Sequence, residues 1–167
     1  MNRIPSTLLA AITAAVALAV PFAAFAQTAS APGTASTKAL VDHGRYLIRI
    51  AGCNDRHTPG YTQANGKVDE KLWLTGDGLG WRGPWGTTYA PNLRLTMQSH
   101  TEASWLQMAH SFQARPPMPY FNVNAMSDHD LRAIYHYVRA LGPAGKPAPA
   151  YVPPGHEPKG PVVTFPG

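Results

Sequence analysis

The chain has 167 residues, a formal net charge of +5 and a charged fraction of only 14%. This length suits one folded domain behind a targeting segment. Lysines and arginines form no run, which excludes a nucleic-acid-binding protein built on a basic stripe. The mild positive charge instead favours protein partners with an acidic docking patch.

The N-terminus has the layout of a secretory signal peptide. Asn2 and Arg3 give a short basic start, residues 8–20 are apolar, and Ala24-Phe25-Ala26 offers an A-x-A cleavage site. A transmembrane anchor is the alternative, but the apolar run is shorter than the roughly 20 residues that a spanning helix needs. We therefore expect residues 1–26 to be removed and the mature protein to be periplasmic or otherwise exported, with no membrane span.

A helix is predicted over residues 40–51, after a small, polar linker at 27–37. Leucine, valine, isoleucine, alanine and glycine fall on one helical face in this stretch, and Gly52 ends it. The apolar face is made of Leu40, Val41, Gly44, Leu47, Ile48 and Ala51.

Residues 58–98 show little periodicity and are rich in glycine, proline and aromatic side chains. A loop of this length is unusual in a compact domain unless it wraps a ligand that serves as the core. We expect that exception here, because aromatic side chains such as Trp81, Trp85 and Tyr89 bury much apolar area. For any one of them, packing in the core is an equal alternative.

Two more helices are predicted. One begins near Thr101 with a capping box formed by Ser99 and Glu102. The other is capped by Ser127 with Asp130, carries an apolar stripe over residues 131–141, and ends at Gly142. We expect this last stripe to pack on the face of residues 40–51, with Gly44 allowing close approach. The remaining residues, 143–167, are rich in proline and predicted to be extended.

Cysteine and histidine use singles out one short stretch. Cys53 is the only cysteine, so no internal disulfide can form, and an inert buried thiol is one alternative to a functional role. His57 follows four residues later, in the sequence C-N-D-R-H. The other six histidines show no compact ligand spacing, which argues against a zinc site.

Four stretches resemble the class I mono-haem cytochrome c family, in family order: "GRYLIRIAGCNDRHTPGY", "GPWGTTYAPNLRL", "RPPMPYF" and "MSDHDLRAIYHYVRALGP". The resemblance covers residues 38–142, and the tail also looks like tails of one bacterial branch. It implies an all-α, cytochrome c-like domain with three to five helices and long loops around one haem pocket. It also implies an electron carrier, not an enzyme, that serves a dehydrogenase, an oxidase or another cytochrome.

The resemblance assigns roles to particular residues. His57 matches the proximal iron ligand and Met118 the distal one, and a His/Met pair suits electron transfer. Prolines flank Met118 and stiffen its backbone, whereas Met97, Met108 and Met126 are expected to fill gaps in the core. Met126 is the second choice of ligand. Trp81, Trp85 and Tyr89 are expected to wall the haem.

Arg56 is the departure from the family. It stands where the motif C-x-x-C-H has its second cysteine, so at most one thioether, through Cys53, can hold a c-type haem. Two alternatives to the carrier remain. One is a haem-free subunit or binding module with this fold. The other is a peroxidase-like or gas-sensing haem protein, if Met118 does not ligate the iron.

Overall fold

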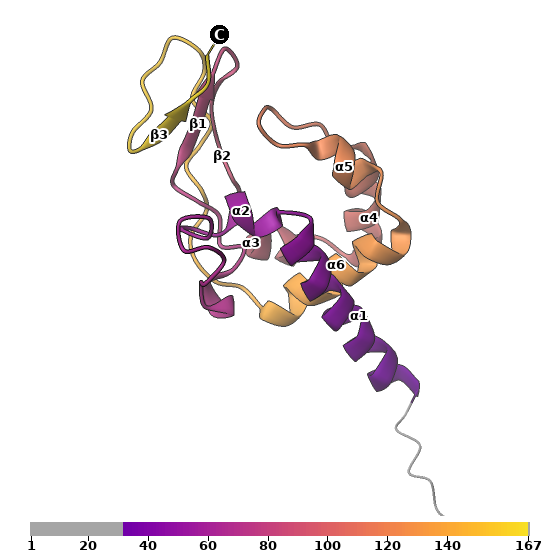
Figure 1. The fold of residues 1–167 in the computed structure, drawn as a ribbon. Coiled ribbons are helices and arrows are strands. Elements are labelled where there is room, and N and C mark those ends of the chain that lie inside the picture. The colour runs from indigo at the N-terminus through magenta and orange to yellow at the C-terminus, as the bar shows by residue number, and fades with distance from the viewer. Residues whose placement is uncertain (1–31, 167) are drawn as a thin grey trace, which may run out of the picture.

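The computed structural model describes the backbone of residues 32–166 and the side chains of residues 36–166. The predicted signal peptide at 1–26 lies outside the described residues. Within the described part, the chain forms helices and a small sheet (Figure 1). In chain order the elements are α1 (Pro32–Ile50), α2 (Cys53–His57), the 3-10 helix η1 (Glu70–Leu72), β1 (Gly80–Gly83), β2 (Gly86–Tyr89), α3 (Leu93–Gln98), α4 (Glu102–Ser111), α5 (Tyr120–Asn124), α6 (Asp128–Leu141) and β3 (Val162–Thr164).

The expectation of an all-α fold is correct only in outline. Six α-helices in the described residues exceed the three to five predicted, and strands β2-β1-β3 form a three-stranded sheet. β1 pairs antiparallel with β2 and parallel with β3. None of the described helices has the length and apolar character needed to cross a membrane.

Helices α1 and α6 pack against each other, as the apolar stripes predicted (Figure 1). Ile48 on α1 and Leu131, Ile134 and Val138 on α6 are buried in one core cluster. At Gly44 a Cβ atom would lie only 2.0 Å from the Ala133 carbonyl oxygen. The missing side chain therefore sets how closely the two helices approach. α1 begins at Pro32, so part of the predicted linker is helical.

Capping fixes both ends of α6. At its start, the Ser127 hydroxyl accepts a hydrogen bond from the Asp130 N–H, as predicted. At its end, the buried guanidinium of Arg94 donates to the carbonyls of Lys71, Leu141 and Gly142. Unpaired carbonyls and the negative end of the helix dipole both favour a cation at this position. Arg94 thus ties α3 and the preceding loop to the end of α6.

We expect Asp130→Asn to destabilise the protein by about 1 kcal/mol at neutral pH. The His43 imidazole and the Ser127 hydroxyl both donate to this carboxylate, and these bonds hold the Asp130 pKa below its ordinary value of 3.8. A carboxylate with a depressed folded-state pKa stabilises the fold above the unfolded pKa. That stability is lost as the pH falls through the folded pKa. Urea unfolding at several pH values measures the effect.

The difference between wild type and Asp130→Asn should shrink below about pH 4. Asp42→Asn is the matched control, because Asp42 is exposed and its ion pair in the described part of the chain is with Lys38 on the same helix. Exposed pairs of this kind contribute well under about 1 kcal/mol. A destabilisation by Asp130→Asn that is equal at all pH values would contradict the electrostatic explanation and indicate lost packing.

The capping box predicted from Ser99 and Glu102 is wrong by two residues. The N-cap of α4 is Thr101, and Ser104 completes a reciprocal box with it. Serine in the second position lacks the reach of glutamate or glutamine, but its hydroxyl still accepts from the Thr101 N–H at 3.0 Å. Glu102 instead binds Arg132 and His136 on α6, which joins α4 to α6.

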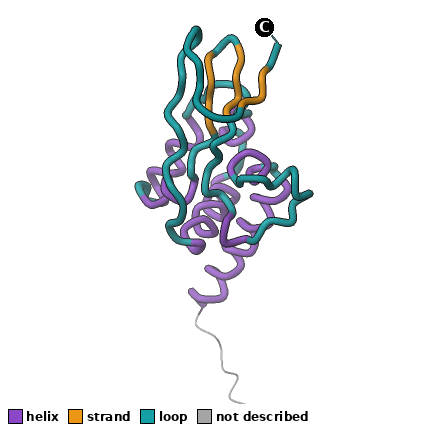
Figure 2. The backbone as a smooth tube through the Cα atoms, turned by 90° about the vertical axis from the view of Figure 1, so that its left-hand side faces the viewer, coloured by secondary structure: helices purple, strands orange, loops and turns teal. Residues whose placement is uncertain are grey.

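The segment 58–98, predicted as a long loop, contains η1, the β1–β2 hairpin and α3. Its strands are short and rich in glycine, which explains why no alternating pattern was visible. The C-terminal tail is extended, as predicted, and folds back along this hairpin (Figures 1 and 2). β3 pairs with β1, and Val152 exchanges backbone hydrogen bonds with Thr87. The tail therefore belongs to the folded structure.

Candidate functional site

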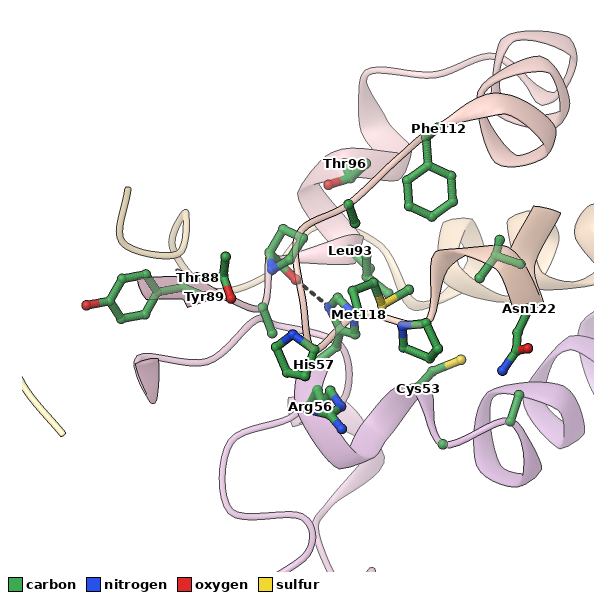
Figure 3. A pocket seen from close by; sticks show the side chains of 18 of the residues that line it. Cys53, Arg56, His57, Thr88, Tyr89, Leu93, Thr96, Phe112, Met118 and Asn122 are labelled. Carbon is green, nitrogen blue, oxygen red and sulfur yellow. Dashed lines mark hydrogen bonds between the residues drawn. The ribbon is translucent and has the colours of Figure 1, made fainter. Parts of the chain in front are cut away.

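A cavity of about 540 Å³ lies between α2, the hairpin, the chain around Met118 and the tail. Its size falls within the range of small-molecule and cofactor pockets. Most of its lining is apolar and aromatic, with side chains such as Ile48, Leu93, Trp105, Phe112 and Ile134. Among the predicted site residues, Cys53, His57, Tyr89 and Met118 line it (Figure 3).

His57 lies at the end of α2 with its imidazole buried. Its Nδ1 is 2.8 Å from the Pro91 carbonyl oxygen, which can only accept, so Nδ1 carries the proton (Figure 3). Nε2 is then the atom with a free lone pair, and it has no hydrogen-bond partner among the described residues. Burial lowers the pKa of His57, and the nearby Arg56 charge lowers it further, against the opposing effect of the Pro91 bond. The imidazole is therefore neutral, the form that binds a metal.

Buried polar contacts fix the backbone around His57. The Gly76 N–H donates to the His57 carbonyl at 2.9 Å. In the next position, the Thr58 hydroxyl donates to the Asn54 side chain and accepts from the Leu74 N–H at 2.8 Å. A five-residue helix is not stable on its own, so these tertiary hydrogen bonds are needed to stabilise it. They hold the backbone that carries His57, whose ring orientation is set by the bond from Nδ1 to the Pro91 carbonyl.

Met118 reaches the cavity from the chain between α4 and α5, on a different part of the fold from His57. The Thr88 hydroxyl on β2 donates to the Pro116 carbonyl at 2.9 Å and so joins this segment to the hairpin. Met118 and His57 line the same cavity, and Figure 3 shows both side chains there. A thioether and an imidazole with a free nitrogen thus share one apolar space.

The other methionines are close by as well. Met97 is fully buried in the core, and Met108 and Met126 pack against it, as expected for residues that fill gaps. All three also line the cavity. Met118 differs from them because prolines flank it on both sides.

Cys53 is on the same helical turn as His57 and also lines the cavity. Burial raises the pKa of its thiol to about 11. At neutral pH the sulfur is therefore protonated, and a protonated thiol is a poor nucleophile for disulfide exchange. Its environment favours a thiol that stays reduced inside the cavity.

Not every predicted residue lines the cavity. Trp85 is not among the lining residues. Its indole packs near Gly83 and Phe165 and its N–H donates to the Trp81 carbonyl at 3.3 Å. Tyr89 does line the cavity, as predicted. The Trp85 ring therefore helps to build the hairpin and does not touch the space that a ligand would occupy.

Sequence reasoning missed the part of the wall that comes from the tail. Pro149 and Tyr151 line the cavity, and the Tyr151 hydroxyl donates to the Trp85 carbonyl at 2.8 Å. Arg115 lies over the Tyr151 ring, with its Cζ 3.8 Å from the ring centroid. The isolated Tyr151 between prolines was the available signal, since an aromatic residue in an extended tail favours docking.

A second group of potential ligands was also missed. His43, His129 and Asp130 place one ligand atom each within 4.8 Å of one another on the surface of α1 and α6. His43 and Asp130 are 87 positions apart in the sequence, so no spacing pattern could reveal them. Asp130 already accepts hydrogen bonds from His43 and Ser127, which accounts for the cluster as part of the α6 cap.

Comparisons of the chain with protein-family models, curated proteins and solved structures found no match. The function therefore has to be inferred from the residues around the cavity.

Proposed function

We propose that this chain is a haem-binding, one-electron carrier of an exported compartment, with His57 and Met118 as the two iron ligands. One observation carries the proposal: a neutral, oriented imidazole with a free Nε2 shares a mostly apolar cavity with a methionine thioether. Haem, when bound, supplies an iron that gains and loses one electron.

The residues present fit such a group. The lining is apolar enough for a flat macrocycle, and the cavity is of cofactor size. The Pro91 carbonyl fixes the His57 tautomer, as ligand histidines commonly require. Met118 would supply the second protein ligand to the iron and would help to keep water away from it. A carrier of this type needs no further catalytic group.

Cys53 is the one residue that can anchor haem covalently, because the position of the second cysteine holds Arg56. Its thiol lies in the same cavity as the His57 ring. We propose one thioether at most. The redox partners proposed are a dehydrogenase, an oxidase or another cytochrome. The net charge, +5 for the full sequence and +4 once Arg3 leaves with the signal peptide, favours an acidic docking patch on them.

An absorption spectrum of the protein purified from its natural compartment tests the proposal. We expect a Soret band and, in the oxidised protein, a methionine–iron charge-transfer band. With one thioether, one vinyl group stays conjugated, so the reduced pyridine complex should absorb at longer wavelength than that of a cytochrome with two thioethers. Acidified organic solvent should leave the haem on the chain.

The same measurement on Arg56→Cys supplies the matched comparison. A second thioether should move the pyridine band to shorter wavelength. High-spin iron in the wild-type protein would contradict Met118 ligation and favour peroxidase-like or gas-sensing chemistry. The absence of any Soret band, together with no uptake of added haem, would overturn the proposal in favour of a haem-free binding module.

A further inference from the structure

Arg56 lies in the cavity wall and forms no ion pair with any residue that the structure describes. Its Nη1 is buried and has no hydrogen-bond partner among the described residues. The guanidinium carbon lies 4.5 Å from the centroid of the Trp81 ring. This cation–π contact offsets part of the cost of burying the charge. It does not provide a hydrogen-bond acceptor for the Nη1–H groups of the guanidinium. An unpaired buried donor on a charged group remains costly.

Trp81 adds a second unpaired donor at the same place. Its indole Nε1 is also buried without a partner among the described residues, and Trp81 lines the cavity beside Arg56. Buried indole N–H groups usually have a partner. Two neighbouring residues that line the cavity, one on α2 and one on β1, thus each carry a buried donor without a partner, and one of the two is cationic.

No protein group in the lining balances this charge. None of the described residues that line the cavity is an aspartate or a glutamate, whereas Arg115 adds a second cation near the Tyr151 ring. An otherwise apolar cavity with two arginines and no acid favours a ligand with an apolar body and an anionic edge. Arginine and indole N–H donors together suit a carboxylate, which accepts several hydrogen bonds.

We propose that Arg56 and Trp81 form a subsite for a carboxylate of the bound ligand. This inference rests on the proposed function, in which the ligand is haem and the carboxylate one of its propionates. Arg56 adjoins His57 on the same short helix, and both residues line the cavity that would hold the ligand. Arg56 would then bind the ligand through a reversible ionic contact, at the sequence position where the attachment motif has its second cysteine.

Ferric deuteroporphyrin and its dimethyl ester are the probes for this subsite. Deuteroporphyrin has hydrogen in place of both vinyl groups, so Cys53 cannot attach to it and equilibrium binding is measured. The ester lacks the charged carboxylates but keeps the ring and the metal. Titrations followed by the Soret band and by tryptophan fluorescence would compare wild type, Arg56→Gln, Arg56→Lys, Trp81→Phe and Arg115→Gln.

We expect Arg56→Gln to weaken binding of the diacid about tenfold to a hundredfold, the usual range for a hydrogen-bonded ion pair. Binding of the ester should change less than about twofold. Wild type should itself prefer the diacid by a similar factor, a comparison that needs no variant to fold. Arg56→Lys should retain part of the preference, and Trp81→Phe should lose a smaller part. Arg115→Gln is the control for removing a cavity arginine that also lies over an aromatic ring but has no buried unpaired nitrogen among the described residues.

Three outcomes would overturn the inference. One is that Arg56→Gln weakens the binding of both probes equally, which would indicate a packing role for the side chain. Another is an unchanged preference for the diacid in that variant. The third is that Arg115→Gln alone removes the preference. Failure of wild type to bind either probe would instead overturn the proposed function, and the inference with it.

Discussion

Replacing His57 with glycine is expected to weaken the binding of ferric haem by more than about a hundredfold. Loss of groups that merely orient a metal ligand costs tenfold to a hundredfold, and the ligand itself should cost more. The imidazole is buried, neutral and held by the Pro91 carbonyl. No other described histidine lines the cavity, so none can take its place as a ligand. Titration of the apoprotein with haem, followed at the Soret band, measures the change.

Two controls separate loss of the ligand from loss of the fold. Added imidazole should restore binding to His57→Gly, because the substitution leaves a space of the same shape. His156→Ala should bind haem like wild type, since His156 is exposed in the tail. Binding by His57→Gly that equals wild type without added imidazole would contradict the assignment of His57.

Met118 and Met126 are distinguished by the same titration. Met118→Ala should retain haem through His57 but give high-spin iron and added peroxidase activity, because one iron position opens. Met126→Ala is the matched variant, as Met126 lines the same cavity and was the second choice of ligand. If Met126→Ala alone gave high-spin iron, the ligand pair would be His57 and Met126.

Gly44→Ala should destabilise the protein by about 3 kcal/mol, at the upper end of the usual cost of overpacking a core. The new Cβ would lie 2.0 Å from the Ala133 oxygen and 2.7 Å from the Tyr137 Cβ. The first neighbour is helix backbone and cannot rotate away. α1 and α6 would therefore have to separate along the core that Ile48 and Val138 share. Urea unfolding followed by circular dichroism measures the loss.

Gly78→Ala is the matched control. Nothing lies within 4 Å of a Cβ at Gly78 and its backbone has no positive φ, so the change should be close to neutral. If Gly44→Ala were as stable as Gly78→Ala, α1 and α6 would not approach as closely at Gly44 as the structure has them. The close contact of these two helices, which the resemblance to cytochromes implies, would then be contradicted.

The sequence by itself determined the elements that depend on local pattern. The apolar stripes of α1 and α6 have helical periodicity, so their existence and their contact through Gly44 were predictable. Ser127 and Gly142 mark the ends of α6 because caps act within four residues. Cys53 and His57 were found together because they stand only four residues apart in the sequence. Their sequence positions did not reveal that both lie on the short helix α2.

Only the tertiary structure decided the features that join distant parts of the chain. The sheet pairs β1 with a strand about 80 positions further on, and short glycine-rich strands carry no periodic signal of their own. Tyr151 in the wall and Trp85 outside it follow from how the tail docks on the hairpin. The unpaired donors of Arg56 and Trp81 are likewise visible only when α2 and β1 are brought together. Local propensity fixes which residues are helical, whereas the environment of a buried charge depends on every segment that packs around it.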